Sequence, residues 1–313
     1  MGTGGVEFGI YVPQVALSYD EVLARALLVE SLGFSSLWLF DHLYTPDLPA
    51  QPAFEGWTLA TALLAQTTRL RVGHLVLCNT FRHPALLGRM ATTLDVVSGG
   101  RLDLGLGSGS YEPEHRRSGI SWGTLRERSE QLGESLEVLQ SMFRNTTTSF
   151  SGQYFRLEDL PNLPPPVQPG GPPIHVGGAG ERFTLPLVAR YADVWNVPTY
   201  ALGDWRRRLD VVHAECDRIG RDPATLRLSQ EVVLVLAEDD RRLAKARAIA
   251  ERRFGAPGFG LAEGGLIGTP EMVIEAIARR VADGVTMFVL FTHDRAGEAT
   301  LRLLAESVVS HFA

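Results

Sequence analysis

Residues that could bind a ligand or carry a proton lie in a few short segments of the sequence. Asp41 and His42 are adjacent, and a histidine side chain changes its charge near neutral pH. Gly107–Gly109 and Gly177–Gly180 are rich in glycine, which lets a backbone approach a ligand closely. A helix is predicted directly after Gly177–Gly180, so backbone N–H groups there could bind an anion, such as the phosphate of a cofactor.

Each of these segments also has a purely structural explanation. Asp41 could cap a helix, His42 could lie on the surface, and Gly177–Gly180 could be a closely packed turn. Gly105–Ser110 (GLGSGS) is similar to a dinucleotide-binding fingerprint, but serine stands at the third glycine position and no helix follows immediately. Ser108 is not in a GxSxG motif, so we do not expect it to be a nucleophile.

The composition argues against several kinds of partner. The 313 residues carry a net charge of -6, which disfavours nucleic acid and anionic membrane surfaces. No histidine or cysteine spacing is typical of a metal site. Cys78 and Cys216 do not make a disulfide framework, Met1–Gly5 lacks signal-peptide features, and no run reaches the ~20 apolar residues of a membrane span. We therefore expect a cytoplasmic protein that acts on a small molecule.

Strand-length apolar runs alternate with helix-length amphipathic patterns along almost the whole chain. Eight strands are predicted near residues 7, 36, 71, 102, 173, 193, 227 and 285, each followed by a helical pattern. Nearly continuous apolar strands indicate a parallel sheet covered by helices on its outer side. Eight repeats favour an α/β fold of the closed (β/α)8 type, the TIM barrel, over an open sheet.

Two segments interrupt this alternation. Residues 144–172 contain a proline-rich run in which no helix can form, and we expect an insertion with a small hairpin at this point. A linker between two domains is the rival interpretation, because a length prior of about 150 residues per domain allows two. The same alternation resumes after residue 172, so we expect one domain over residues 1–313. Residues 255–268 are rich in glycine and predict a mobile loop.

A (β/α)8 barrel places its active site at the carboxyl ends of the strands. The predicted barrel therefore brings together residues that are far apart in the sequence. They are Gln14 after the first strand, Asp41 and His42 after the second, Asn79 and Thr80 after the third, Gly107–Ser110 after the fourth, Gly177–Gly180 after the fifth, Asn196 after the sixth, Glu231 or its neighbours at the seventh and His293 after the eighth.

Several motifs, in their order, resemble the luciferase-like monooxygenase superfamily, and in particular its branch that uses the deazaflavin coenzyme F420. They are WLFDH at 38–42, NTFRHP at 79–84, SGGRLDLGLGSG at 98–109 with YEPEH at 111–115, and IHVGGAGER at 174–182 followed by VARYADVWN at 188–196. The resemblance covers about residues 6–292 and is specific as a set. It implies a (β/α)8 barrel in which residues 144–172 are a family insertion.

The resemblance also implies roles for individual residues. Asp41 and His42 would lie close to the deazaflavin ring, with His42 as the acid–base or substrate-orienting residue. Leu75–Val76 matches a bulge behind the ring that is often a non-proline cis peptide. The remaining cofactor-binding residues that it implies are Asn79, Gly107, Ser108, Gly109, Gly177, Gly178, Ala179, Gly180 and Asn196.

Two departures from the family pattern bear on the substrate. The sugar-phosphate dehydrogenases of this superfamily have a glutamate where Ser110 stands and a tryptophan where Pro46 stands, so we do not expect glucose 6-phosphate as the substrate. Glu112 and His115 remain as candidate proton donors.

The leading hypothesis is hydride transfer between C5 of F420 and an unidentified small organic substrate. The alternatives are an FMN-dependent monooxygenase and a barrel that binds flavin or deazaflavin without catalysis. The family also implies a homodimer.

Overall fold

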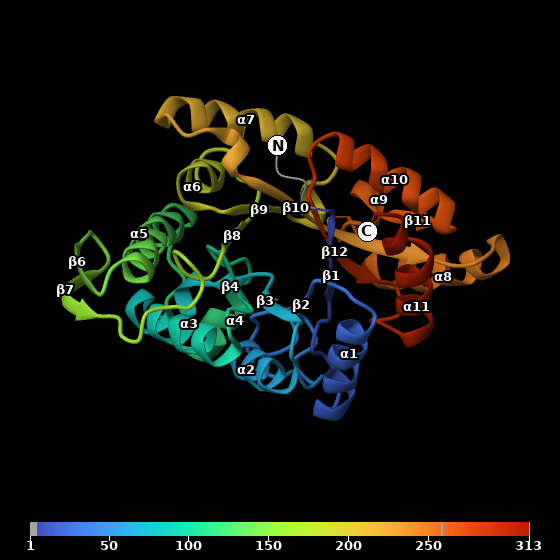
Figure 1. The fold of residues 1–313 in the computed structure, drawn as a ribbon, viewed down its shortest axis with the longest axis horizontal. Helices are drawn as coiled ribbons and strands as arrows, with labels where there is room; N and C mark the ends of the chain where they lie inside the picture. Colours follow the sequence, from blue (N-terminus) through green and yellow to red (C-terminus); the bar gives the residue numbers. More distant parts are fainter. Residues whose placement is uncertain (1–4, 258, 313) are drawn as a thin grey trace.

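A closed barrel of eight parallel strands forms the centre of the protein (Figure 1). The computed structural model describes residues 5–257 and 259–312, so residues 1–4, part of the segment that shows no signal-peptide pattern, lie outside it. The strands, in order around the barrel, are β1 (Glu7–Tyr11), β2 (Ser36–Leu39), β3 (Arg71–His74), β5 (Leu102–Gly107), β8 (Ile174–Gly177), β9 (Val194–Val197), β10 (Arg227–Leu236) and β12 (Met287–Thr292). β12 pairs with both β10 and β1, which closes the ring and confirms the predicted fold.

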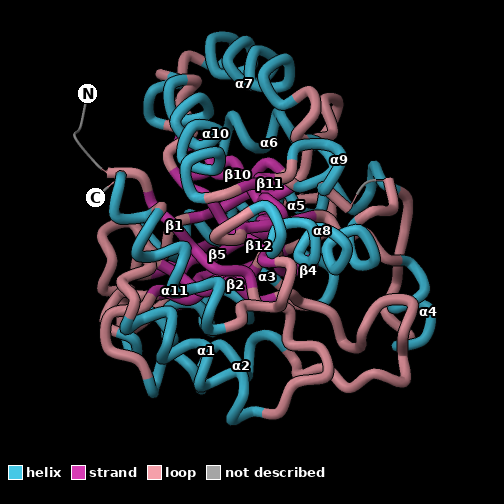
Figure 2. Tube along the Cα trace, turned by 90° about the vertical axis from the view of Figure 1, so that its right-hand side faces the viewer, coloured by secondary structure: helices cyan, strands magenta, loops and turns pink. Residues whose placement is uncertain are grey.

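Helices enclose the strands on all sides (Figure 2). They are α1 (Tyr19–Ser31), α2 (Gly56–Gln66), α3 (Pro84–Ser98), α5 (Leu125–Arg144), α6 (Thr184–Tyr191), α7 (Trp205–Ile219), α8 (Asp240–Phe254), α10 (Pro270–Ala282) and α11 (Glu298–Ser307). The predicted capping box of Ser18 and Glu21 begins α1. None of the helices in the described ranges is long and apolar enough to cross a membrane.

Four short elements go beyond the sequence prediction, which lacked the first two and gave the hairpin formed by the other two without its strand boundaries. β4 (Leu77–Cys78) pairs with β5 after an interruption of β3, and α4 (Glu112–Ser118) follows β5. The predicted hairpin in residues 144–172 consists of β6 (Thr147–Ser151) and β7 (Arg156–Pro161), which pair antiparallel. In Figure 1 the hairpin lies at the edge of the molecule beside α5.

The predicted loop at residues 255–268 is wrong in its second half. The structure has a short helix, α9 (Leu261–Gly264), and a strand, β11 (Leu266–Gly268). β11 pairs with residues 234–236 of β10, the longest strand of the barrel. The end of β10 extends beyond the other strands and pairs with β11, and a three-residue strand between glycines leaves no periodic pattern in the sequence. The α6 helix also begins two residues later than predicted, because residues 181–183 form a turn.

The barrel interior has an apolar layer above a polar one. Its apolar cluster consists of Tyr11, Trp38, Phe40, Leu75, Met287 and Val289. Trp38 fits because glycines face it: a Cβ atom at Gly9 or Gly73 would lie 2.7 or 2.6 Å from its ring. Toward the amino-terminal end of the strands, the buried Asp103 forms an ion pair with the partly exposed Arg71. The opposite end is left open for the site described next.

Candidate active site

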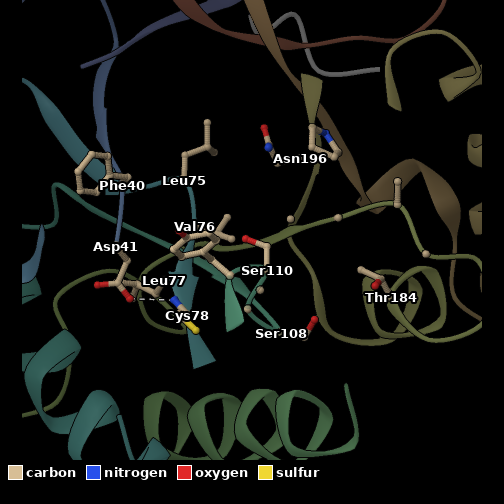
Figure 3. A pocket seen from close by; sticks show the side chains of 18 of the residues that line it. Phe40, Asp41, Leu75, Val76, Leu77, Cys78, Ser108, Ser110, Thr184 and Asn196 are labelled. Carbon is tan, nitrogen blue, oxygen red and sulfur yellow. Dashed lines mark hydrogen bonds between the residues drawn. The ribbon is translucent and has the colours of Figure 1, made fainter. Parts of the chain in front are cut away.

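A cavity of about 360 Å³ opens at the carboxyl ends of the barrel strands, and we call it the mouth cavity. Its volume lies within the range of ligand pockets, roughly 300–1,000 Å³. Figure 3 shows side chains from the strand ends gathered around it. The residues predicted from sequence that line it are Asp41, His42, Leu75, Val76, Gly107, Ser108, Gly109, Gly177, Gly178, Ala179, Gly180 and Asn196.

Asn79 is the one predicted cofactor-binding residue that does not line the mouth cavity. It begins a 3-10 turn (Asn79–Phe81) directly after β4 and is buried. Its Nδ2 atom has no hydrogen-bond partner among the described residues. The turn follows the short strand that the sequence prediction lacked, which is why the prediction placed Asn79 at the strand end itself.

Leu75 and Val76 form the floor of the mouth cavity. The peptide bond between them is cis, as the resemblance implies for this position. In Figure 3, Leu75 lies between Phe40 and Asn196, with Val76 below it. Glycines make room for Val76: a Cβ atom at Gly107 or Gly177 would lie 2.7 or 2.8 Å from its methyl groups. The close approach of Val76 to the ends of β5 and β8 therefore requires glycine at both positions.

Asp41 is fully occupied by protein donors. Its two carboxylate oxygens accept hydrogen bonds of 2.7 and 2.8 Å from the guanidinium of Arg82, and Oδ2 also accepts one of 2.8 Å from the backbone N–H of Cys78 (Figure 3). Arg82 donates further to Glu55 at 2.7 Å. Burial alone would lower the pKa of Arg82, but its two carboxylate partners raise it. This geometry makes Asp41 an anchor that ties the end of β2 to β4.

His42 is held by a carboxylate that the sequence prediction gave no role. Its Nδ1 atom lies 2.9 Å from Oε2 of Glu114, which is buried in α4. Because a carboxylate accepts, Nδ1 of His42 is the nitrogen that donates to it, and in the neutral imidazole Nε2 is then the free acceptor. The other oxygen of Glu114 accepts from the backbone N–H groups of Leu43 and Tyr44. Glu114 thus fixes both the ring of His42 and the loop that follows it.

Free backbone donors lie at the end of the Gly177–Gly180 segment, which lines the mouth cavity. Protein donors occupy its carbonyl groups: Trp195 Nε1 donates to Gly178 O at 2.9 Å, and Arg208 donates to Ala179 O. In the described part of the chain, the N–H groups of residues 180–182 donate to no other residue. They lie just before the start of α6, where the helix dipole favours negative charge. The segment can bind an anion through its backbone.

The two proton donors proposed from sequence differ in position. Glu112 is exposed and does not line the mouth cavity. His115 lines it, but its two nitrogens are 2.6 Å from the hydroxyl of Thr80 and 3.2 Å from the carbonyl oxygen of Tyr111. Cys78, beside His115, stays a neutral thiol because burial raises its pKa to about 11. These contacts make this side of the cavity a hydrogen-bonded wall.

The opposite wall carries Asn196 and Glu231. The Asn196 side chain accepts a hydrogen bond of 3.1 Å from Ser229, which fixes its orientation. Glu231 lines the mouth cavity from β10, and burial raises the pKa of its carboxyl to about 7 even though a backbone hydrogen bond from Thr199 opposes the shift. The sequence placed Glu231 near the site without giving it a role.

This arrangement suits an organic cofactor with an anionic group. An apolar floor, a backbone anion cradle and two titratable side chains, His42 and Glu231, surround one cavity. Three or more metal-ligating side chains do not come together anywhere in residues 5–257 and 259–312. The fold and site thus define a (β/α)8 barrel built to hold a cofactor and a substrate at its mouth.

The sequence family agrees with this architecture. The model of the luciferase-like monooxygenase family matches residues 6–258, and the chain belongs to that family. It is 31% identical over 250 residues to an F420-dependent hydroxymycolic acid dehydrogenase of Mycobacterium tuberculosis, covering 79% of this chain and 67% of that protein. It is 32% identical over 177 residues to an F420-dependent glucose-6-phosphate dehydrogenase of Amycolatopsis mediterranei, covering 55% of this chain and 50% of that one.

Solved structures share the whole fold. The coenzyme F420-dependent tetrahydromethanopterin reductase of Methanopyrus kandleri superimposes with a TM-score of 0.79 over 99% of this chain and 100% of that one, at 18% identity. An F420-dependent secondary alcohol dehydrogenase in complex with an F420–acetone adduct gives a TM-score of 0.80 over 98% of this chain and 99% of that one, also at 18% identity. At this identity the likeness concerns the fold alone.

Proposed function

We propose that this protein is an oxidoreductase that uses coenzyme F420 and acts on a small organic molecule. Membership of the luciferase-like family and the two relatives named as F420-dependent dehydrogenases support the proposal. The observation that carries it is that Leu75–Val76 and Gly177–Gly180, which lie a hundred residues apart, line one cavity at the barrel mouth. The resemblance assigns these two segments to the ring and the phosphate of the cofactor.

The residues of the mouth cavity fit such a group in two respects. The free N–H groups of residues 180–182 can bind a phosphate, and their carbonyl neighbours are already held by Trp195 and Arg208. Leu75 and Val76 offer an apolar surface against which a flat ring can pack. When bound, F420 supplies hydride transfer at C5 of its ring.

The side chains of the protein then have separate tasks. Asp41 holds β4 in place through Arg82 and the N–H of Cys78. His42, with Nδ1–H donated to Glu114, presents Nε2 as an acceptor that can orient a substrate hydroxyl or exchange its proton. Phe40 and Leu75 exclude water from the floor of the cavity.

The substrate is a small molecule whose identity we leave to a screen, because it is set by loops at the barrel mouth. We also expect a homodimer, which sedimentation velocity would measure directly. Both expectations are separate from the choice of cofactor.

The experiment that tests the proposal is a fluorescence titration of the purified protein with F420 and, in parallel, with FMN. We expect F420 to bind with a dissociation constant in the micromolar range or below, and FMN to bind at least tenfold more weakly. Such a result would justify a screen of alcohols, aldehydes and enones by the change in F420 absorbance.

Other outcomes would change the proposal in defined ways. A preference for FMN would favour a flavin-dependent monooxygenase, the alternative activity of the same fold. Binding of F420 without turnover on the panel would favour a cofactor-binding barrel without catalysis. Failure to bind either compound would contradict the proposed cofactor.

A further inference from the structure

Glu231 lies on the inner side of β10, between a polar pair of side chains and the apolar cluster of the barrel interior. Side chains alternate along a strand, so Glu231 points to the same side of β10 as Ser229, whose hydroxyl bonds to Asn196 inside the barrel. Its partner in β12 is Val289, a member of the apolar cluster of the interior. β9 ends level with Gln230, so Glu231 lies just beyond the end of β9, at the mouth cavity that it lines.

The buried carboxyl groups of the barrel have strong donors, whereas Glu231, which is half-buried at the mouth cavity, has not. Buried carboxylates need partners, because an unpaired buried charge is costly. Asp41 accepts from Arg82 and the N–H of Cys78, and Asp103 accepts from Arg71. Asp95 accepts from Gln168 and two backbone N–H groups, and Glu114 is bonded to His42 and two backbone N–H groups. Among the described residues, Glu231 has one donor, the backbone N–H of Thr199, and no cation within ion-pair distance.

The side chains that interact with Glu231 supply no positive charge to its carboxyl. Tyr11 from β1 and Tyr200 from the turn after β9 interact with it electrostatically, and neither supplies a positive charge. Arg208 acts on Tyr200 and donates to Ala179 O, while β12 presents Val289. His42 and Glu114 lie on the far side of the cavity, where they bond to each other. Burial therefore raises the pKa of Glu231 to about 7, where a carboxyl can both give and take a proton.

A purely structural role explains this placement poorly. A neutral side chain such as leucine or glutamine would fill the same wall without the cost of an ionisable group. The carboxyl also borders the cavity instead of packing against a helix. His42 is paired with a carboxylate, whereas Glu231 has no cation beside it. Two titratable groups in such different environments at one site are typical of an acid and a base with separate roles in catalysis.

We propose that Glu231 is the residue that exchanges a proton with the substrate bound in the mouth cavity. In the oxidative direction, the O–H bond of a substrate hydroxyl breaks and its proton goes to the Glu231 carboxylate. The hydrogen of the adjoining carbon leaves with its electron pair for oxidised F420, and a C=O bond forms. The reverse direction returns the proton from Glu231 to the oxygen. This step rests on the proposed function for its oxidant, and it assigns alcohols or their carbonyl counterparts as the substrate class.

The test compares the wild-type protein with Glu231→Gln, which has the shape of the protonated side chain, and with Glu112→Gln as a matched control on the exposed rim. F420 binding is measured by calorimetry at pH 7 in two buffers of different ionisation enthalpy, which reports protons taken up on binding. We expect the wild type and Glu112→Gln to take up the same fraction of a proton and Glu231→Gln to take up less, because the bound ring further desolvates the carboxyl. The difference between variants removes proton changes of the cofactor itself.

Each outcome decides one claim. Equal proton uptake in wild type and Glu231→Gln, with tight F420 binding in both, would overturn the role of Glu231 and leave the proposed function intact. Absence of F420 binding would overturn the proposed function instead. In that case a carbon-13 NMR titration of the free protein, with Glu231→Gln to assign the signal, decides the residue: titration of Glu231 below about pH 5 would contradict the proposal.

The turnover of an alcohol found in the F420 screen gives a second readout. We expect Glu231→Gln to lower kcat by at least 100-fold while the F420 dissociation constant changes by less than about threefold. Glu231→Asp, which keeps a carboxyl, should recover part of the loss. A Glu231→Gln protein with wild-type kcat and an unchanged pH profile would contradict the assignment.

Discussion

The two ends of the barrel contain carboxyl groups with opposite properties. Near the amino-terminal end, Asp103 receives hydrogen bonds of 2.8 and 2.9 Å from Arg71, and His175 lies 3.4 Å away. Burial alone would raise the pKa of Asp103, but these neighbours lower it to about 2. At the mouth, burial raises the pKa of Glu231, which lacks such neighbours, to about 7.

This difference separates stability from chemistry within one barrel. A carboxylate fixed by a guanidinium stays charged and joins strands, as Arg71 does by also donating to the carbonyl groups of Gly100 and Leu102. A carboxyl without a cation stays able to change its charge near neutral pH. In (β/α)8 barrels the carboxyl ends of the strands carry the active site and the other end carries stability, and the two acids follow that division.

The largest effect on stability is expected from a substitution at the amino-terminal end of the barrel. Asp103→Asn should lower the free energy of unfolding by about 3–5 kcal/mol, because it leaves the Arg71 guanidinium without its charge partner. Urea denaturation measures this. Asp283→Asn, which breaks an exposed ion pair with Arg206, is the control and should cost less than about 1 kcal/mol. Equal losses in the two variants would show that the base of the barrel has no special role in stability.

A second prediction compares how the contributions of Glu231 and Asp103 to stability change with pH. Glu231 has a raised pKa in the folded protein, so its contribution to stability is present below its ordinary pKa of 4.5 and is lost as the pH rises through about 7. A shift of this size corresponds to about 3 kcal/mol. Asp103 has a lowered pKa, so its contribution is present above its ordinary pKa of 3.8 and is lost as the pH falls through about 2.

The measurement is the free energy of unfolding from pH 3 to pH 9 for the wild type, Glu231→Gln and Asp103→Asn. The difference between wild type and Glu231→Gln should fall with rising pH, and the difference between wild type and Asp103→Asn should rise. A pH-independent difference for Glu231→Gln would mean that the pKa of its carboxyl is the same in the folded and the unfolded protein, which contradicts the prediction.

His42 provides the third prediction, within the mouth itself. His42→Ala should lower kcat/KM by about 100-fold, because Nε2 would no longer orient the substrate hydroxyl. His83→Ala is the control, since His83 is exposed and caps α3 outside the mouth cavity. Steady-state kinetics with a substrate from the screen measure both variants. Unchanged turnover in His42→Ala would remove His42 from the mechanism and leave Glu231 as the only titrating side chain proposed for it.

Much of the fold could be predicted because buried parallel strands leave nearly continuous apolar runs. All eight barrel strands lie where such runs predict them, and the residues that follow the strands converge at one cavity. Residues 112–118 (EPEHRRS) form α4 without any apolar periodicity, so the sequence did not reveal this helix. The contact of Glu114 with His42, which joins residues 72 positions apart, was hidden for the same reason.

Glu231 was only partly visible in the sequence. It is a single charged residue in the run QEVVLVL, and such a run predicts a buried strand whether or not one side chain is acidic. Whether a cation accompanies it depends on β1, β9 and β12, which are distant in sequence. What pointed to Glu231 is that a single carboxyl stands in an apolar strand and that a (β/α)8 barrel places its active site at the carboxyl end of that strand. That the chain behaves as one domain stays a prediction, which a single unfolding transition would support.

The smallest expected effect concerns the backbone of the anion cradle. Gly180→Pro removes one free N–H group, and Gly180 has no positive φ angle that would conflict with a proline ring. Gly180→Ala is the matched control: it places a Cβ atom 3.2 Å from the Thr184 hydroxyl, as proline also does, but keeps the N–H. A hydrogen bond to a charged group contributes about 1.5–3 kcal/mol, so Gly180→Pro should weaken F420 binding by at least about tenfold. Gly180→Ala should change the F420 dissociation constant by less than about threefold in the same fluorescence titration.

Equally weakened F420 binding in both variants would assign the effect to the added carbon and not to the lost N–H donor. Wild-type binding in both variants would mean that the phosphate does not bind at this segment. The expected result would show that the mouth binds charge through backbone dipoles, whereas the base of the barrel binds it through Arg71.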